Sequence, residues 1–462
     1  MSPYDGCAFP LVRTLSIDVF GLDGASSTDY DSQSGDDDDG YSTKMHTVYP
    51  PDTAANIAAF VRRLKEMMPA ARDVIMTSTN TGNLLQRSAK HMMDLARRLF
   101  DLAEKRTTID YSRCEIAYYV DLAPISDIVN IRCFIEDVTD PILALVRRCA
   151  QTLQTLDICG KSASARSGFI QDPDSGAYVE YPQLYTLAIN TFATYVMSPR
   201  PVFNGAVPFP GLRRLRIDDD YPFDDDVAFR GNSATLESLR LALQPATVAM
   251  LKKYSVFTPT SHPRLQCVDI PSLQPLAPSP FASFASYTQF VLSIAPNAAV
   301  RAISDLSNFG RSHPLALSML GKHASIQILV LPKVSLSLWS AINLIKSLAL
   351  LSDLYTAAPT FDELGQGINM AELPDYVRST YAPVGQQFRC WQFGYKEEIV
   401  YEELATFMLL LALVCPSFDY VALSKDHREP FMEVMKRMIT EPGFVHYAPR
   451  LRRLLFNGWK DC

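Results

Sequence analysis

The sequence lacks the features that mark a secreted protein. Its nine cysteines form no C-x-x-C pair, and no N-x-[ST] glycosylation site occurs. The first residues, MSPYDGCAFP, contain neither the basic nor the apolar segment of a signal peptide. Most cysteines lie inside apolar periodic segments such as LVRRCAQTL. This use of cysteine is typical of a reducing compartment, so we expect a cytoplasmic or nuclear protein.

Positive charge and long apolar runs are also scarce. The chain has 43 Lys and Arg against 50 Asp and Glu, which gives a net charge of −7. A nucleic-acid-binding protein normally carries a basic stripe, so we expect no nucleic-acid partner. The longest apolar run begins at Leu404 and has about thirteen residues. It is too short to span a bilayer, and we predict a buried helix there and no membrane contact.

The motifs of common enzymes and metal sites are missing as well. No H-E-x-x-H, G-x-S-x-G or G-x-x-x-x-G-K-[ST] phosphate loop occurs, and GQGINM from Gly365 has only two glycines of a dinucleotide-binding motif. A calcium loop with Gly40 at its sixth position would begin at Gly35 and end at His46, which do not fit the ligand pattern. We therefore predict no enzyme, no cofactor and no metal. An enzyme whose groups converge from distant positions is the alternative.

What the sequence does contain is one phrase that recurs. FPGLRRLRID at Phe209 has similar decamers at Phe9, Tyr181, His262 and Ala448. Proline precedes the first apolar position by two residues in six cases, where it ends a helix and favours an extended chain. These prolines are Pro10, Pro182, Pro210, Pro263, Pro416 and Pro449. The shared template, [LVIF]-x-x-[LV]-x-[ILF], begins at Val12, Leu153, Leu184, Leu212, Leu236, Leu265, Ile326, Phe418 and Leu451.

The spacing of the matches indicates a leucine-rich-repeat solenoid. From Leu153 to Leu265 the matches lie 31, 28, 24 and 29 residues apart. The later gaps of 61 and 92 correspond to about two and three such units, and the last gap is 33. We predict a single α/β solenoid over residues 1–462, with repeats of about 24–33 residues. Its parallel strands would line the concave side, and its helices would lie outside.

Helical patterns occupy the segments between the matches. In TDPILALVRRCAQTLQTLDICG, Pro141 suits a first helical turn and a strand follows. The predicted buried residues are Ile142, Leu145, Val146 and Cys149 in the helix and Leu153, Leu156 and Ile158 in the strand. TAANIAAFVRRLKEMMP places Ile57, Phe60, Val61, Leu64 and Met67 on one face, with Arg62, Arg63, Lys65 and Glu66 outside.

A helix ending in Cys or Pro and followed by L-x-x-L-x-[LI], as in RRCAQTLQTLDICG and VCPSFDYVAL, resembles the repeats of F-box proteins. FPLVRTLSI followed by NIAAFVRRLKEMMPAARDV is similar to fungal F-box-type leucine-rich-repeat proteins. The resemblance implies a substrate receptor of a ubiquitin ligase. No F-box is recognisable, since ELPDYVRSTYAP at Glu372 has an L-P opening without the apolar helix pattern. The chain is interpreted as a repeat-only relative or as one that lacks its first segment.

Two acidic stretches interrupt the pattern. Residues 23–50 contain almost no aliphatic side chain, and we predict a disordered insert within the solenoid. IDDDYPFDDDV from Ile217 contains six aspartates, which need water or counterions. A polar connection between repeats is one interpretation of this second stretch, and a site for a basic partner peptide is the other.

Alternation along the strands defines the candidate surface, because every second residue of a solenoid strand faces the concave side. From this strip we predict a partner-binding set of Asp157, Arg214, Arg216, Asp218, Arg240 and Asp269. The three arginines would make bidentate contacts with a partner's carboxylates, or would pair internally with Asp218 or Asp269. The strip comprises Thr14, Ser16, Asp18, Thr155, Asp157, Cys159, Thr186, Ala188, Asn190, Arg214, Arg216, Asp218, Ser238, Arg240, Ala242, Cys267 and Asp269.

Toward the C-terminal end the outward positions become apolar. Ile328, Val330 and Leu455 would face the concave side, where they form a docking patch or are covered by helices from 335–381. Trp459 would cap the last repeat. The resulting prediction is a monomeric, non-catalytic protein-interaction solenoid, with a stand-alone scaffold unconnected with ubiquitin as the alternative.

Overall fold

The structure of the chain is a computed structural model. Predictions for 23–50, Gly365, Leu455 and Trp459 lie outside the residues that it describes. The described residues are 14–18, 59, 62, 63, 66, 67, 73–77, 108–111, 127–135, 141–160, 168–172, 174–191, 202–218, 221–242, 244–258, 260–270, 281, 284–303, 320, 321, 323, 325–332, 334–360, 371–381, 383–394, 400–423, 425–452 and 454.

Strands and helices alternate along the chain. The strands are β1 Thr14–Asp18, β2 Asp73–Thr77, β3 Thr108–Tyr111, β4 Asn130–Ile135, β5 Thr155–Gly160, β6 Thr186–Thr191, β7 Arg214–Ile217, β8 Ser238–Leu241, β9 Cys267–Ile270, β10 Val300–Ile303, β11 Ile328–Leu331, β12 Asp353–Ala357, β13 Cys390–Gly394 and β14 Tyr420–Ala422. The helices are α3 Pro141–Arg148, η2 Val227–Phe229, α5 Pro245–Lys253, α6 Phe284–Ser293, α8 Leu338–Ser347, α9 Leu373–Thr380, α10 Tyr401–Val414, α11 Lys425–Met438, η4 Val445–Tyr447 and α12 Ala448–Leu451.

The chain forms two compact units. Unit 1 comprises Met1–Arg216 and Pro222–Asn232, and unit 2 comprises Ile217–Tyr221 and Ser233–Cys462. In unit 1 each strand from β1 to β6 pairs in parallel with the next strand along the chain. The strands β8 to β14 of unit 2 pair in the same way. The predicted parallel α/β arrangement is confirmed, whereas the continuity of one solenoid over the whole chain stays a prediction.

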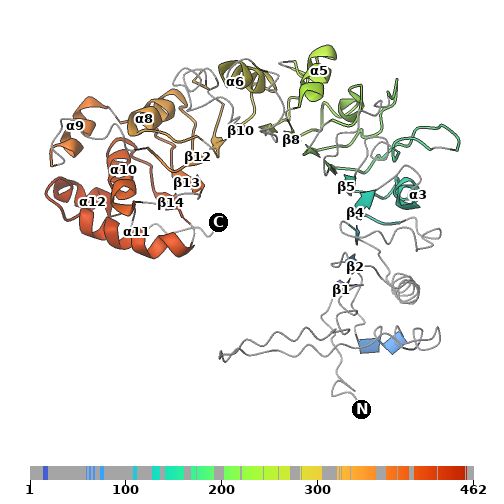
Figure 1. Cartoon of the computed structure of the whole chain (residues 1–462), viewed down its shortest axis with the longest axis horizontal. Helices are drawn as coiled ribbons and strands as arrows, with labels where there is room; N and C mark the ends of the chain where they lie inside the picture. The colour runs from blue at the N-terminus through green and yellow to red at the C-terminus, as the bar shows by residue number, and fades with distance from the viewer. Residues whose placement is uncertain are drawn as a thin grey trace, which may run out of the picture. The chain divides into compact units, whose positions relative to one another are not determined.

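Within each unit, strands and helices occupy opposite sides. In unit 1, α3 lies to one side of β4 and β5, and in unit 2 the helices α5, α6 and α8 to α10 lie to one side of β8 to β14 (Figure 1). This arrangement leaves the other face of the strands away from these helices. In the described part of the chain, no helix is both long and apolar enough to cross a membrane.

The recurring ten-residue motif forms a turn followed by a strand. The Leu184 N–H donates to the Tyr181 carbonyl at 3.2 Å, which places Pro182 second in a four-residue turn. The same bond closes the turns at Leu212, Leu265 and Phe418, at 3.3, 3.1 and 3.2 Å. Proline is favoured at the second turn position because its ring already fixes φ near −65°. The proline therefore shapes the turn itself, in addition to the predicted effect on the preceding helix.

The three apolar positions of the template are buried where the structure describes them. In β7, Leu215 and Ile217 are 1% exposed and the alternating residues Arg214 and Arg216 are exposed, after a fully buried Leu212. The apolar residues predicted for α3 and β5 are likewise 0% exposed. In α10 every residue from Leu404 to Val414 is buried, as predicted for the apolar run. The described helical positions Arg62, Arg63 and Glu66 are exposed, also as predicted.

The template missed six strands. In four of them the middle position is neither Leu nor Val, and the residues there are Ile109 of β3, Ile131 of β4, Arg301 of β10 and Trp391 of β13. β12 has Leu354 there but Thr356 at the last position, and β2 begins after an unmatched Ala71. The gap of 61 residues therefore contains one further strand, and the gap of 92 contains two, as the spacing predicted.

The last template match is wrong. Leu451 ends the helix α12, and Leu454 is also helical. Apolar residues three positions apart lie on one face of a helix, and the first two apolar positions of the template have the same spacing, so this spacing alone does not distinguish the two. Pro449 lies in the first turn of this helix, where proline is well tolerated, instead of before a strand.

Arg301 replaces the buried aliphatic residue of its repeat. Its side chain is 0% exposed and donates from Nη1 to the carbonyl oxygens of Val291 and Ile294, at 3.2 and 2.6 Å. Nη2 donates to the carbonyl of Ala295. These acceptors lie at the C-terminal end of α6, where the helix dipole favours a positive charge. Burial lowers the pKa of Arg301 to about 10, which leaves it charged at neutral pH.

Candidate functional site

The predicted site residues of unit 1 lie on exposed strand positions. Asp157 of β5 is paired with Arg132 of β4, with 3.2 Å between Oδ2 and Nε, and the two residues are direct neighbours in the strand register. Arg132 escaped prediction because β4 was missed. Arg214 and Arg216 of β7 are exposed, which confirms their predicted orientation. Exposed ion pairs contribute little to stability, so the Asp157–Arg132 pair adds little to the stability of the fold.

The other three site residues form one ion-pair group in unit 2. Arg240 lies between two carboxylates: its Nε is 2.6 Å from Asp218 Oδ1, and its Nη1 is 2.9 Å from Asp269 Oδ2. Internal pairing, one of the two alternatives for the arginines, is therefore correct for Arg240. The group carries a formal charge of −1, with the arginine side chain 40% exposed.

Two residues of the predicted strip do not face outward. Ala242 is fully buried because β8 ends at Leu241 and the alternation ends with it. Cys159 is 5% exposed, since the last three residues of β5 are all buried. The other members of the strip from Thr155 to Asp269 are half-buried or exposed, as predicted.

In unit 2 the strand register aligns the outward residues in two rows. The Arg240 row runs through Arg240, Asp269, Ala302, Val330, Tyr355 and Gln392. The Ser238 row runs through Ser238, Cys267, Val300, Ile328, Asp353, Cys390 and Tyr420. Both rows change from polar residues at β8 and β9 to apolar residues at β10 and β11. Beyond β11 they mix apolar and polar groups.

A hollow of about 200 Å³ opens on these rows over β11, β12 and β13. Ile328 and Val330 are half-buried on its lining, and the buried Leu354 contributes as well. The helices α8 and α9 lie to one side of β12 and β13 (Figure 1), and Ile328 and Val330 contribute to the lining of the open hollow. Of the two predicted alternatives for these residues, the docking patch fits this arrangement. The remaining lining residues are Asp353, Tyr355, Cys390 and Gln392.

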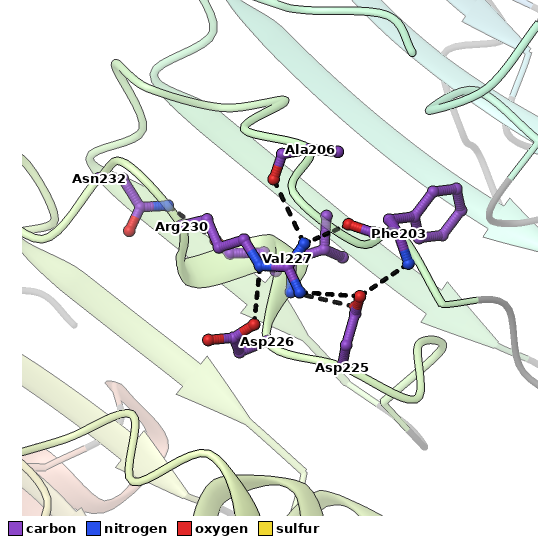
Figure 2. A network of polar contacts seen from close by, with 8 residues as sticks. Phe203, Ala206, Asp225, Asp226, Val227, Arg230 and Asn232 are labelled. Atoms are coloured by element: carbon purple, nitrogen blue, oxygen red, sulfur yellow. Dashed lines mark hydrogen bonds and ion pairs between the residues drawn. The ribbon is translucent and has the colours of Figure 1, made fainter. Parts of the chain in front are cut away.

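The acidic segment after Ile217 is partly buried, contrary to the interpretation as a purely polar connection. Asp225 is 1% exposed and accepts hydrogen bonds from the backbone N–H groups of Phe203 and Val227, at 2.7 and 3.2 Å. Its Oδ2 also lies 2.9 Å from Arg230 Nη2 (Figure 2). A buried carboxylate with three donors is satisfied internally and therefore serves the fold.

Arg230 joins this segment to the preceding loop. Its Nε is 2.8 Å from Asp226 Oδ1, and its Nη1 donates to the carbonyls of Phe203 and, at 3.4 Å, Ala206 (Figure 2). The next residue, Gly231, has φ +75°, and a Cβ there would approach Val207 Cγ1 to 2.3 Å. Only glycine allows this backbone without strain and without a clash.

The comparisons leave the function to be argued from this geometry, since no family model and no curated protein matches the sequence. Among the described residues, no group of three or more histidine, cysteine, aspartate or glutamate side chains is placed to hold a metal ion. The feature that stands out is the strand face of unit 2, with an ion-pair group at β8 and β9 and a hollow at β11 to β13. The sequence predicted all three residues of the ion-pair group, but only Ile328 and Val330 of the residues that line the hollow.

Proposed function

We propose that the chain is a non-catalytic protein-interaction scaffold of the leucine-rich-repeat type, which binds a protein partner on the exposed face of its strands. It would be similar to the substrate-recognition part of F-box ubiquitin-ligase receptors. The observation that carries this proposal is the pair of residue rows on β8 to β13, which offers a charged part and an apolar part on one sheet face.

The repeated units support the leucine-rich-repeat assignment. Four repeats open with the same hydrogen-bonded turn, the short strands pair in parallel, and β7 to β12 alternate buried and outward residues, which is how repeats of 20 to 30 residues bury a continuous core. The outward residues are free to differ between repeats because they do not contribute to that core. Parallel strands with one face left open to a partner are typical of binding solenoids.

The chemistry of the surface supports a protein partner. Arg214 and Arg216 present guanidinium groups, which recognise carboxylates by two parallel hydrogen bonds. The hollow next to half-buried apolar side chains suits an anchoring side chain of the partner. Within unit 2 alone, a strand face that carries both charged and apolar residues is more typical of a protein interface than of a site for a small polar substrate.

The experiment is affinity purification of the full chain from cells, with quantitative mass spectrometry of the bound proteins. The double variant Arg214→Ala/Arg216→Ala should lose partners bound at these arginines, while Lys346→Ala on the helix side should lose none. An adaptor of a ubiquitin ligase among the partners supports the receptor role, and stable partners without one support the stand-alone scaffold. A catalytic activity that a single polar substitution abolishes would contradict both.

A further inference from the structure

The hollow of unit 2 combines apolar walls with one carboxylate. Ile328 and Val330 of β11 and Tyr355 of β12 provide apolar surface, and Asp353 lies in the same lining. Its volume of about 200 Å³ is below the range of roughly 300–1,000 Å³ that is typical of sites for drug-sized ligands. The hollow therefore suits a single long side chain of a larger partner.

Asp353 is the group that determines which side chain fits. It is half-buried, and its Oδ2 accepts a hydrogen bond from Ser352 Oγ at 2.5 Å. Within the described ranges it forms no ion pair, in contrast to Asp218 and Asp269, which share Arg240. A carboxylate on an apolar surface is stabilised by a cation that brings its own apolar stem.

We propose that this hollow binds the side chain of an arginine from a protein partner; the inference rests on the proposed function and names the chemistry of its ligand. The aliphatic stem lies along Ile328 and Val330, and the guanidinium group pairs with Asp353. The planar guanidinium also stacks on the ring of Tyr355. The side-chain oxygen of Gln392 is a further acceptor on the same lining.

Arginine fits these groups better than the other candidate side chains. A leucine or phenylalanine would cover the apolar walls but would leave the Asp353 carboxylate without a cation. Lysine carries the charge, but its ammonium group neither binds a carboxylate through a planar fork nor stacks on an aromatic ring. An acidic side chain would be repelled.

The charges around the hollow also favour a cation. The neighbouring Asp218, Arg240 and Asp269 group has a formal charge of −1, and the chain as a whole carries −7. The exposed Arg389 acts in the opposite sense, because it directly precedes Cys390, the register partner of Asp353, and so brings a positive charge close to that carboxylate. Removing the charge of Arg389 should therefore strengthen the binding of an arginine.

The test uses a displayed library of random twelve-residue peptides, selected on the immobilised full chain. Selected peptides should share an arginine, and synthetic copies should bind the Asp353→Asn variant about tenfold or more weakly, because a charge-assisted hydrogen-bonded pair is lost. Replacing that arginine by citrulline should have the same effect, and replacement by lysine a smaller one. Arg389→Gln should bind a few-fold more tightly. Asp419→Asn changes the residue directly before the strand β14. It is the matched control and should bind normally.

The outcomes separate this inference from the proposed function. Peptides that lose binding on Val330→Glu but show no need for arginine or for Asp353 overturn the arginine socket and leave the interaction scaffold standing. Peptides that bind all strand-face variants equally well overturn both. The thermal unfolding midpoint of Asp353→Asn should match that of the unmodified chain, because the substitution removes no ion pair within the described residues. A selection that yields no arginine-containing peptide also contradicts the inference.

Discussion

The two ends of the strand face in unit 2 are built on the same buried framework but present different surfaces. At β8 and β9 the outward residues are charged, and Arg240 satisfies two aspartates internally. At β11 the outward residues Ile328 and Val330 are apolar, and the outward Asp353 of β12 forms no ion pair within the described ranges. The buried residues of β8 and β11 are nevertheless equivalent leucines. The comparison shows that the core of each repeat determines the fold, while the residues between the core positions determine what the surface can bind.

The largest expected effect comes from the shared framework. Leu239→Ala in β8 and Leu329→Ala in β11 remove fully buried side chains at equivalent positions, and each should lower the free energy of unfolding by about 2–5 kcal/mol. Chemical denaturation measures the loss. Val330→Ala, between two such positions, should cost much less. A small loss of stability for only one of the two leucine substitutions would show that Leu239 and Leu329 are not equivalent positions.

Acid should destabilise the β9 end through His262, the first residue of the turn before that strand. Burial lowers the pKa of His262 from 6.5 to about 4, so the unfolded chain binds the proton more tightly. The contribution of the uncharged His262 to the free energy of unfolding is fully present above pH 6.5 and is lost as the pH falls toward 4. The total loss is limited to about 3 kcal/mol. The difference in unfolding free energy between the unmodified chain and His262→Gln should follow this pH range. His446→Gln, at an exposed position, is the control for the substitution itself and should leave the unfolding free energy at neutral pH nearly unchanged.

Arg301 lies in β10, between the two ends of the strand face. It tests whether an apolar residue at the middle template position always gives a more stable fold. Arg301→Leu restores the template but leaves three carbonyl oxygens near the end of α6 without their donor. We expect a loss of about 1–3 kcal/mol and faster amide hydrogen exchange in the last turn of α6. Arg264→Leu, at an exposed position, is the control. An increase in stability for Arg301→Leu would show that burying the charge costs more than its hydrogen bonds return.

The smallest effect concerns the ion pairs themselves. Arg240→Ala removes two contacts of a side chain that is 40% exposed, so the loss of stability should be about 0.2–1 kcal/mol and should shrink as salt is added. Unfolding at low and high ionic strength measures this dependence. A loss that is independent of salt would place the stabilisation in packing of the arginine stem instead of in its charge.

How much the sequence predicted differs between the core and the surface. The parallel strands at eight of the nine template matches follow from apolar spacing alone, because every repeat must bury the same three apolar positions. The same template failed at Ile131, Arg301 and Trp391, where a different side chain fills the middle position, and at Leu451, where helix and strand spacing coincide. Asp353 and Tyr355 could not be assigned to the site because their strand was not recognised. Internal pairing of Arg240 was only one of two alternatives, since a sequence does not determine which of several nearby carboxylates a side chain contacts.

The most direct test of the central claim is a matched pair of surface substitutions in the affinity purification. Val330→Glu places a charge on the strand face, beside the hollow, and Leu350→Glu places the same charge at an exposed apolar residue that follows α8. If the strand face binds the partner, Val330→Glu should lose the bound proteins while Leu350→Glu retains them, with both variants folded. Retention of every partner by Val330→Glu, or their loss only in Leu350→Glu, would contradict the account.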